Sequence, residues 1–334
     1  MSSPFPDLPD GPFTSPVDAV APRLRGGVAA IGNFDGVHRG HQEVLAVARA
    51  AAEELGGPAV VLTFEPHPRA FFRPDQPVFR LTPPAERAVV LEALGLDGMV
   101  VTPFDADLAG TSADGFVDLI LRERLGVRGA VVGYNFHFGK ARAGTPDFLQ
   151  ARGRADGFAV TVVEARVDEG GEPISSTRIR AALEAGAPEA AARLLGYRWL
   201  VVGEVVHGDK RGRTLGYPTA NIALAPSCGL RHGVYAVRVS VDGVLHDGVA
   251  SFGRRPMFDD GAPLFETHLF GFEGDLYGRA LRISVFAFLR PEARFDGVDA
   301  LVTQMDRDSA EARAILAAAD PLSDLDRTLS FPAG

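Results

Sequence analysis

The pattern of apolar residues changes once along this chain of 334 residues, and the change limits the folds that it can adopt. Up to about residue 185, short apolar runs alternate with stretches of helical spacing. Beyond that point several strand-like runs follow one another, with the hairpin signal Asp242-Gly243 between two of them. Alternating β and α units favour an open parallel sheet, whereas successive strands favour an antiparallel barrel. We therefore predict two domains of different class, each long enough to bury a core.

The predicted boundary lies near Gly186-Ala187-Pro188 and separates domains over residues 25–186 and 187–334. In the first domain we expect strands at residues 27–32, 59–64, 98–101, 130–133 and 158–163, and helices from His41 onward and at about 84–94, 112–124, 146–153 and 177–185. In the second we expect strands at residues 199–206, 233–241, 244–250, 264–270 and 281–288, followed by two helices at about 298–305 and 309–318. Residues 1–24 carry six prolines and few aliphatic side chains, so we expect a flexible N-terminus.

Composition and charge exclude several classes of partner. The net charge of −9 argues against binding to nucleic acid or to an anionic membrane surface. No apolar run approaches the roughly 20 residues that cross a bilayer, and the N-terminus does not resemble a signal peptide, so we expect a cytoplasmic protein. The single Cys228 cannot form an intrachain disulfide or a thiolate zinc site.

A segment rich in glycine and cations, residues 203–221, has the composition of a phosphate-binding loop. Glycines let the backbone approach an anion, and Lys210, Arg211 and Arg213 stand between them. The segment closes on Pro218-Thr219-Ala220-Asn221, which supplies a hydroxyl and a carboxamide suited to Mg²⁺ and a polyphosphate oxygen. On composition alone a solvated connecting loop is the commoner reading of such a stretch.

A second segment, residues 31–42, places two imidazoles at the start of a predicted helix. The apolar strand ends in Gly32-Asn33-Phe34-Asp35-Gly36, and His38-Arg39-Gly40-His41 follows. Backbone N–H groups and the helix dipole favour an anion there, and Gly40 lets a nucleotide come close. Two surface histidines or a metal site are the alternative readings, although no third metal ligand lies nearby in sequence.

Together these two segments resemble, in the expected order, the signatures of the bifunctional riboflavin kinase/FAD synthetase family. The resemblance implies an α/β parallel-sheet nucleotidyltransferase domain of Rossmann-like fold, which transfers an adenylyl group to FMN, followed by an antiparallel β-barrel riboflavin kinase domain with C-terminal helices. It also implies riboflavin, FMN, FAD, ATP, ADP and pyrophosphate as ligands, with Mg²⁺ accompanying ATP. It does not fix the oligomeric state, the metal preference or the fate of the intermediate FMN.

The resemblance also implies roles for particular residues. Catalytic roles fall to His38, His41 and Arg180 in adenylyl transfer and to Glu266, the expected base of the kinase. Contacts to ATP and phosphate fall to Gly32, Asn33, Phe34, Gly40, Ser176, Thr177, Arg178, Gly208, Lys210, Gly212, Arg213, Thr219 and Asn221, of which Thr219 and Asn221 would also hold Mg²⁺. Contacts to flavin fall to His67, Phe72, Asn135, Phe138 and Arg294.

Two positions depart from the family pattern, because Met257 stands where threonine is usual and Gly271 where aspartate is usual. Two other hypotheses therefore stay open: an FAD synthetase with a weakened kinase domain, and a flavin-binding regulator without turnover. The retained Glu266 and the two imidazoles weigh against the regulator, because a pure binder needs neither a base nor an ATP site.

Overall fold

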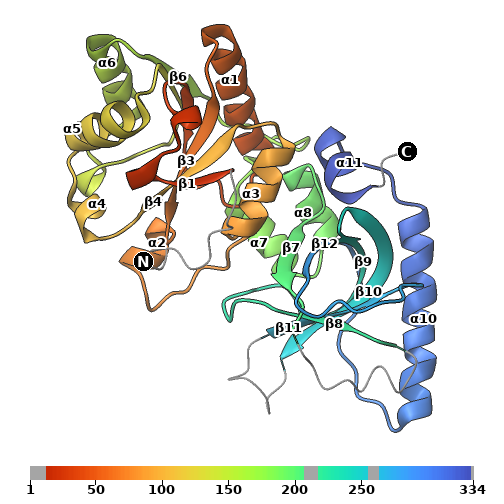
Figure 1. Ribbon diagram of the computed structural model, residues 1–334. Coiled ribbons are helices and arrows are strands. Elements are labelled where there is room, and N and C mark those ends of the chain that lie inside the picture. Colours follow the sequence, from red (N-terminus) through yellow and green to blue (C-terminus); the bar gives the residue numbers. More distant parts are fainter. Residues whose placement is uncertain (1–12, 207–216, 255–262, 332–334) are drawn as a thin grey trace. The chain divides into compact units, whose positions relative to one another are not determined.

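The protein is described here by a computed structural model that covers residues 13–206, 217–254 and 263–331 (Figure 1). Contacts divide the chain into two compact units. One comprises Met1–Val78 and Thr82–Ser175, and the other comprises Phe79–Leu81 and Ser176–Gly334. The units meet in sequence earlier than the predicted domain boundary near Gly186, and the short segment Phe79–Leu81 belongs to the second unit.

The first unit is built on a parallel sheet with the strand order β1-β4-β3-β2-β5-β6. Its strands are β1 Thr14–Pro16, β2 Val28–Ile31, β3 Ala59–Glu65, β4 Gly98–Pro103, β5 Gly129–Gly133 and β6 Ala159–Val163. Every residue of β2 and β3 is buried, as the continuous apolar runs of a parallel sheet require. The predicted parallel α/β class of this unit is confirmed.

Helices connect these strands, and several of them begin at a residue whose side chain caps the first turn. They are α1 Arg39–Leu55, α2 Pro68–Phe72, α3 Pro84–Ala93, α4 Ala106–Gly110, α5 Ala113–Phe116 with a π-helical continuation Val117–Leu125, and α6 Pro146–Asp156. The side chain of His38 caps the first turn of α1, and Gly56 ends that helix with φ of 61°. The side chain of Thr145 caps α6, whose first residue is Pro146.

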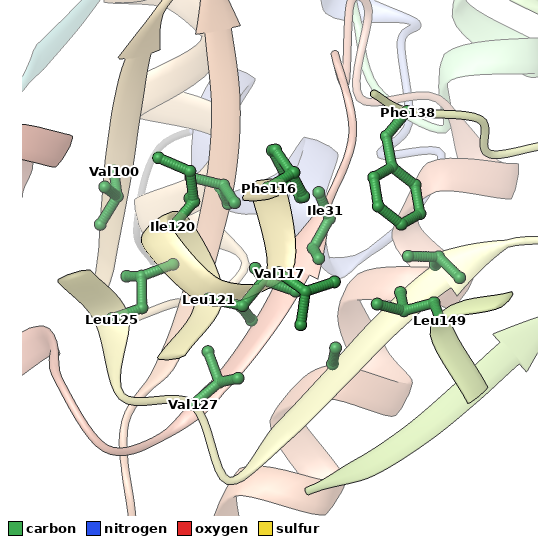
Figure 2. Packing of buried hydrophobic residues seen from close by; sticks show 14 of the residues in the cluster. Ile31, Val100, Phe116, Val117, Ile120, Leu121, Leu125, Val127, Phe138 and Leu149 are labelled. Atoms are coloured by element: carbon green, nitrogen blue, oxygen red, sulfur yellow. The ribbon is translucent and has the colours of Figure 1, made fainter. Parts of the chain in front are cut away.

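The core of the first unit lies against the sheet, where β2, β4 and β5 meet α5, the π-helical turn and α6. Figure 2 shows Ile31, Phe116, Val117 and Leu149 from these elements packed together with Phe138 from the loop after β5. Burial of this apolar surface holds the carboxyl ends of the strands in place. In open parallel sheets these ends carry the ligand site.

The second unit is an antiparallel sheet of order β7-β12-β9-β10-β11-β8, nearly closed into a barrel. Its strands are β7 Leu200–Glu204, β8 Ala220–Ala223, β9 Gly233–Val241, β10 Val244–Arg254, β11 Pro263–Leu269 and β12 Ala280–Arg290. An isolated bridge between Val206 and Asn221, with a 2.9 Å hydrogen bond from the Val206 N–H to the Asn221 carbonyl, links the two ends of the strand order. The predicted antiparallel barrel is confirmed.

Four helices accompany the barrel in the described part of the second unit: α7 Ser176–Glu184, α8 Pro188–Leu195, α10 Val298–Ala317 and α11 Asp324–Ser330. In Figure 1, α10 runs alongside β9 and β10, on which it packs. The buried carboxylate of Asp326 in α11 accepts hydrogen bonds from the backbone N–H and the guanidinium of Arg198. The guanidinium of Arg238 in β9 donates to the carbonyls of Leu316 and Ser330, so the C-terminal helices are fixed to the barrel.

Two expectations from the sequence are wrong. Residues 13–24 are not a flexible tail, because β1 pairs with β4 and Leu24 is 1% exposed. The two helices expected over residues 298–318 form the single helix α10. Its middle carries Asp308, which is 4% exposed and whose carboxylate accepts hydrogen bonds from Nε and from one terminal nitrogen of Arg290.

Candidate active sites

The turn after β2, which begins at Gly32, is held in place by buried side chains. The carbonyl of Asn33 accepts a 2.8 Å hydrogen bond from a terminal guanidinium nitrogen of Arg87, and the other terminal nitrogen of Arg87 pairs with the carboxylate of Glu65 at the end of β3. Arg87 is 0% exposed, so this ion pair is screened little by solvent. The backbone of the turn therefore has a fixed position at the carboxyl end of the sheet.

Thr82 fastens the same turn from a second direction. Its hydroxyl accepts a 2.7 Å hydrogen bond from the Gly36 N–H, and its own N–H donates to the carboxylate of Asp35 at 3.0 Å. Thr82 and Asp35 are both buried. Phe34 and Val37 have φ of 46° and 36°, a left-handed backbone that costs free energy for residues with a Cβ, and these anchors hold it.

His38 and His41 lie together at the start of α1, as the sequence predicts. Their rings stack with centroids 3.6 Å apart and an interplanar angle of 15°. Nδ1 of His38 accepts a 3.2 Å hydrogen bond from the His41 N–H, so the neutral His38 ring carries its proton on Nε2. Nδ1 of His41 is buried and has no hydrogen-bond partner among the described residues.

Both imidazoles are held neutral at physiological pH. Burial lowers the pKa of His38 to about 4, against smaller opposing contributions from a backbone hydrogen bond and Asp35. Burial and the adjacent His38 lower the pKa of His41 well below its usual range. The pair therefore offers N–H donors to an anion without carrying positive charge of its own.

Two glycines leave room at this turn. A Cβ at Gly40 would lie 3.3 Å from the Nδ1 and Cε1 atoms of His38, and a Cβ at Gly32 would lie 3.2 Å from the Phe34 ring. Both distances are tighter than an ordinary contact, so any larger residue would press on the histidine ring or on the ring that packs against His41.

The predicted flavin residues of the first unit have unequal exposure. Phe72 is 65% exposed and packs edge-on against Phe104, Asn135 is exposed, and His67 caps α2 through Nδ1. Phe138, by contrast, is 7% exposed and belongs to the core. The partly exposed Phe136 stacks on Phe138 with an interplanar angle of 17° and was missed by sequence reasoning, although it lies in the same aromatic run.

The remaining residues predicted for adenylyl transfer lie on α7, in the second unit. This helix begins at Ser176 and carries Thr177, Arg178 and Arg180 in its first turns. Nε of Arg180 donates a 2.6 Å hydrogen bond to the carbonyl of Phe79. The guanidinium is thereby oriented by the segment Phe79–Leu81.

In the barrel, two predicted kinase residues lie on neighbouring strands. Asn221 of β8 is the direct antiparallel partner of Glu266 in β11, and Ser251 of β10 is the partner of Glu266 on its other side. Directly paired residues share a face of the sheet, so the three polar side chains form a row. Asn221 is 5% exposed, and its carboxamide oxygen has no hydrogen-bond partner among the described residues.

Thr219 lines a pocket of about 450 Å³ beside this row, measured with the open space at its mouth. The other lining residues are Val205, Pro218, Ala220, Leu269, Phe272, Gly274, Asp275, Leu276 and Tyr277. Sequence reasoning included Thr219 and noted the pattern Gly274-Asp275-Leu276-Tyr277-Gly278, but it gave no role to the lining residues from this stretch. Within the described residues no cluster of three His, Cys, Asp or Glu side chains could hold a metal.

Six residues singled out in the sequence lie outside the described residues: Gly208, Lys210, Arg211, Gly212, Arg213 and Met257. Arg294 is exposed and follows β12. Gly271 lies in the turn after β11 with φ of 67°, and a Cβ there would meet nothing within 4 Å.

The fold and the two sites define a chain with a nucleotidyltransferase module followed by a flavokinase module. Residues 21–178 match the FAD synthetase family, and residues 195–316 match the riboflavin kinase family. The chain belongs to the family of bifunctional riboflavin kinase/FMN adenylyltransferases.

Relatives with that name match 85–89% of this chain. The protein from Pseudomonas fluorescens is 45% identical over 297 residues, which is 89% of this chain and 95% of the relative. The protein from Bacillus subtilis is 38% identical over 294 residues, or 85% of this chain and 91% of the relative. A crystal structure from Streptococcus pneumoniae, named a macrolide-efflux protein, has a TM-score of 0.77 and 33% identity, and the match covers 90% of this chain and 99% of that one. Among the described residues of this chain, no helix has the length and apolarity to cross a membrane.

Proposed function

We propose that this chain makes FMN from riboflavin and ATP in its barrel and then makes FAD from FMN and a second ATP at the turn after β2. The observation that carries this function is that each family match contains two predicted site residues that lie together, the stacked pair His38–His41 in one and the paired Asn221–Glu266 in the other. Cytoplasmic location and Mg²⁺ as the metal stay predictions.

Adenylyl transfer at the first site needs orientation and charge stabilisation. A phosphate oxygen of FMN attacks the α-phosphorus of ATP, the bond to the bridging oxygen breaks, and pyrophosphate leaves. The Nε2–H of His38 is aimed by the hydrogen bond that Nδ1 accepts, and it donates to phosphate oxygens beside the N-terminus of α1. Gly32, Asn33, Phe34 and Gly40 provide the close backbone approach, and Ser176, Thr177, Arg178 and Arg180 are proposed as further phosphate contacts.

Flavin recognition in the first unit is proposed for the exposed aromatic and amide side chains. Phe72 offers a ring face, Asn135 an amide, and His67 a second polar group at the start of α2. The burial of Phe138 favours a supporting role in which this ring backs Phe136. Of these two stacked rings, Phe136 is the one nearer to solvent.

Phosphoryl transfer in the barrel requires a base for the ribityl hydroxyl. Glu266 accepts this proton while the hydroxyl oxygen attacks the γ-phosphorus of ATP and ADP leaves. The residues present fit a magnesium ion held jointly with phosphate, because the hydroxyl of Thr219 and the carboxamide oxygen of Asn221, which has no hydrogen-bond partner among the described residues, are hard oxygen donors. When bound, Mg²⁺ neutralises phosphate charge. Gly208, Lys210, Gly212, Arg213 and Arg294 are proposed nucleotide and flavin contacts on the family pattern.

The alternative of an FAD synthetase with a weakened kinase is less well supported. Gly271 lies in an exposed turn beyond β11, whereas Asn221 and Glu266 are paired within the sheet. An aspartate at position 271 would have open space but would have to adopt a left-handed φ. Its absence therefore leaves the Asn221–Glu266 pair in place.

One assay of the full-length chain tests the proposal. The purified protein is incubated with riboflavin and Mg²⁺·ATP, and the flavins are separated by chromatography. We expect both FMN and FAD. In Glu266→Gln, FAD should form from added FMN but not from riboflavin. FAD from FMN alone with the natural chain would favour the single-activity enzyme, and unchanged flavin with either substrate would favour the regulator.

A further inference from the structure

The stretch Tyr217–Thr219, which carries one proposed magnesium ligand, is not part of a strand. Regular pairing begins only at Ala220, where β8 starts. The position of Thr219 therefore depends on side chains that hold the preceding residues. Within the described residues two such contacts are present, and they come from different elements.

His268 of β11 makes the first contact. Its Nδ1 lies 2.9 Å from the carbonyl oxygen of Pro218. A carbonyl can only accept, so Nδ1 carries the proton in this contact. The hydrogen bond exists with a neutral ring protonated at Nδ1 and also with an imidazolium, so its formation does not depend on the charge of the ring.

His268 lies on the same strand, β11, as the proposed base Glu266. His268 follows Glu266 by two residues, and alternate residues of a strand lie on the same face. The strand that bears the proposed base thus also holds the backbone next to Thr219. The single strand β11 therefore carries both the proposed base and the residue that holds the metal-binding loop.

Tyr217 makes the second contact. Its ring centroid lies 4.8 Å from that of His268, and its hydroxyl donates to the carboxylate of Asp306 in α10. Burial and the hydrogen bond to Asp306 raise the pKa of Tyr217, so the hydroxyl keeps its proton. The loop is clamped between a barrel strand and an outer helix.

We infer that His268 is a positioning residue for phosphoryl transfer, which holds Pro218–Thr219 at a fixed distance from Glu266 through its hydrogen bond to the Pro218 carbonyl. The inference rests on the proposed kinase function of the barrel. It assigns to His268 no contact with riboflavin or with the reacting atoms. A lost anchor should therefore loosen the metal-binding loop rather than remove a reacting group.

Three substitutions of His268 separate positioning from bulk packing. In His268→Ala, we expect the Mg²⁺ concentration for half-maximal riboflavin phosphorylation to rise about tenfold, the effect of one lost hydrogen bond of ordinary strength. The amide N–H of His268→Asn lies near the place of Nδ1–H and should restore the requirement to within about threefold. His268→Gln puts its amide nearer the place of Nε2 and should behave like His268→Ala. Tyr217→Phe should add a second, smaller rise, because it removes only the bond to Asp306.

Two controls keep the result specific. His232→Asn alters another barrel histidine, whose ring packs on Phe252, and it should leave the Mg²⁺ requirement unchanged. FAD formation from FMN should stay at the level of the natural chain in each variant, because its proposed central pair, His38 and His41, lies in the other unit. An unchanged Mg²⁺ requirement in His268→Ala, or an equal defect in His268→Asn, would overturn the inference.

A second readout does not need turnover. Mg²⁺ is titrated calorimetrically into the chain saturated with ADP and riboflavin, and His268→Ala should weaken the barrel-site binding about tenfold. If the natural chain bound Mg²⁺ in a His268-dependent way yet formed no FMN, the proposed kinase function would fail while the positioning role stood. If FMN formed normally and binding did not depend on His268, the positioning role alone would fail.

Discussion

A buried, uncharged histidine can donate a hydrogen bond to an anion, and it needs no counter-ion when the site is empty. His38 also caps α1, so one side chain performs a structural and a binding task. The two tasks use different nitrogens, since Nδ1 accepts from the His41 N–H while Nε2 carries the proton. A suitable substitution can therefore remove one task and keep the other.

The substitution His38→Asn makes this separation. Asparagine is a favoured N-cap, and its carboxamide oxygen can accept the bond from the His41 N–H, but it lacks a donor at the place of Nε2–H. We expect FAD formation from FMN to fall about 100-fold, the usual effect of removing one donor to transition-state charge. FMN formation from riboflavin should be unchanged. Normal FAD formation would contradict the role of His38.

Acid should destabilise the first unit through the same residue. The pKa of His38 is about 4 in the folded chain, below its unfolded value near 6.5. The unfolded chain thus takes up a proton that the folded chain refuses, so stability is complete above about pH 6.5 and is lost as the pH falls towards about 4. The loss should approach about 3 kcal/mol. Urea unfolding of the natural chain across this range, compared with His38→Asn, measures it, and parallel pH curves for the two chains would contradict the assignment.

At the scale of single residues, the sequence identified those side chains whose chemistry is local. His38 and His41 are three positions apart in sequence, so the contact between their rings follows from helix geometry. Thr82 and Arg87 could not be identified, because their partners Asp35, Gly36 and Asn33 are distant in sequence. The burial of Phe138 depends on packing that the sequence does not display.

At the scale of elements, the ion pair between the end of β3 and α3 is a structural joint. Replacing Arg87 by methionine leaves the carboxylate of Glu65 in place without its guanidinium and frees the Asn33 carbonyl from that anchor. We expect a loss of about 3 kcal/mol in the free energy of unfolding. FAD formation should fall as well, because the turn after β2 loses its support. Chemical denaturation followed by circular dichroism measures the stability change.

A matched control for this joint is Arg122→Met. Arg122 forms a 2.9 Å pair with Asp118 within one helix, but both side chains are about half exposed, so the expected cost is under about 1 kcal/mol. Equal effects of the two substitutions would show that burial of the Arg87 pair adds nothing. A larger effect at Arg122 would contradict the ranking by burial.

Elements with strong periodicity were predicted well, and those specified by tertiary contacts were not. The strand expected at residues 233–241 is β9, and the helix expected at about 84–94 is α3, Pro84–Ala93. The helix α8 was missed because Gly186 and Pro188 read as a linker, although proline at the first position of a helix is well tolerated. The short strand β1 follows a proline-rich stretch, and only its pairing with β4 makes it a strand.

At the scale of the whole molecule, the two activities should be separable and should complement each other in solution. Each proposed reaction centre draws its central pair from one unit, His38 and His41 from the first and Asn221 and Glu266 from the second. A mixture of His38→Asn and Glu266→Gln should therefore convert riboflavin to FAD after a lag, while neither protein does so at a comparable rate alone. Chromatography over time measures the lag. The absence of FAD from the mixture would show that FMN does not leave one chain for another.

The segment Phe79–Leu81 limits how this polypeptide can be divided. It is encoded within the first half, yet the Leu81 carbonyl accepts a 2.7 Å bond from the Trp199 indole, and Phe79 packs edge-on against the same ring. If the chain were divided between the two catalytic regions, these three residues would be separated from the downstream residues that they contact. Expression of the upstream half as a separate protein would require redesign of that stretch, beginning with a polar replacement for Phe79.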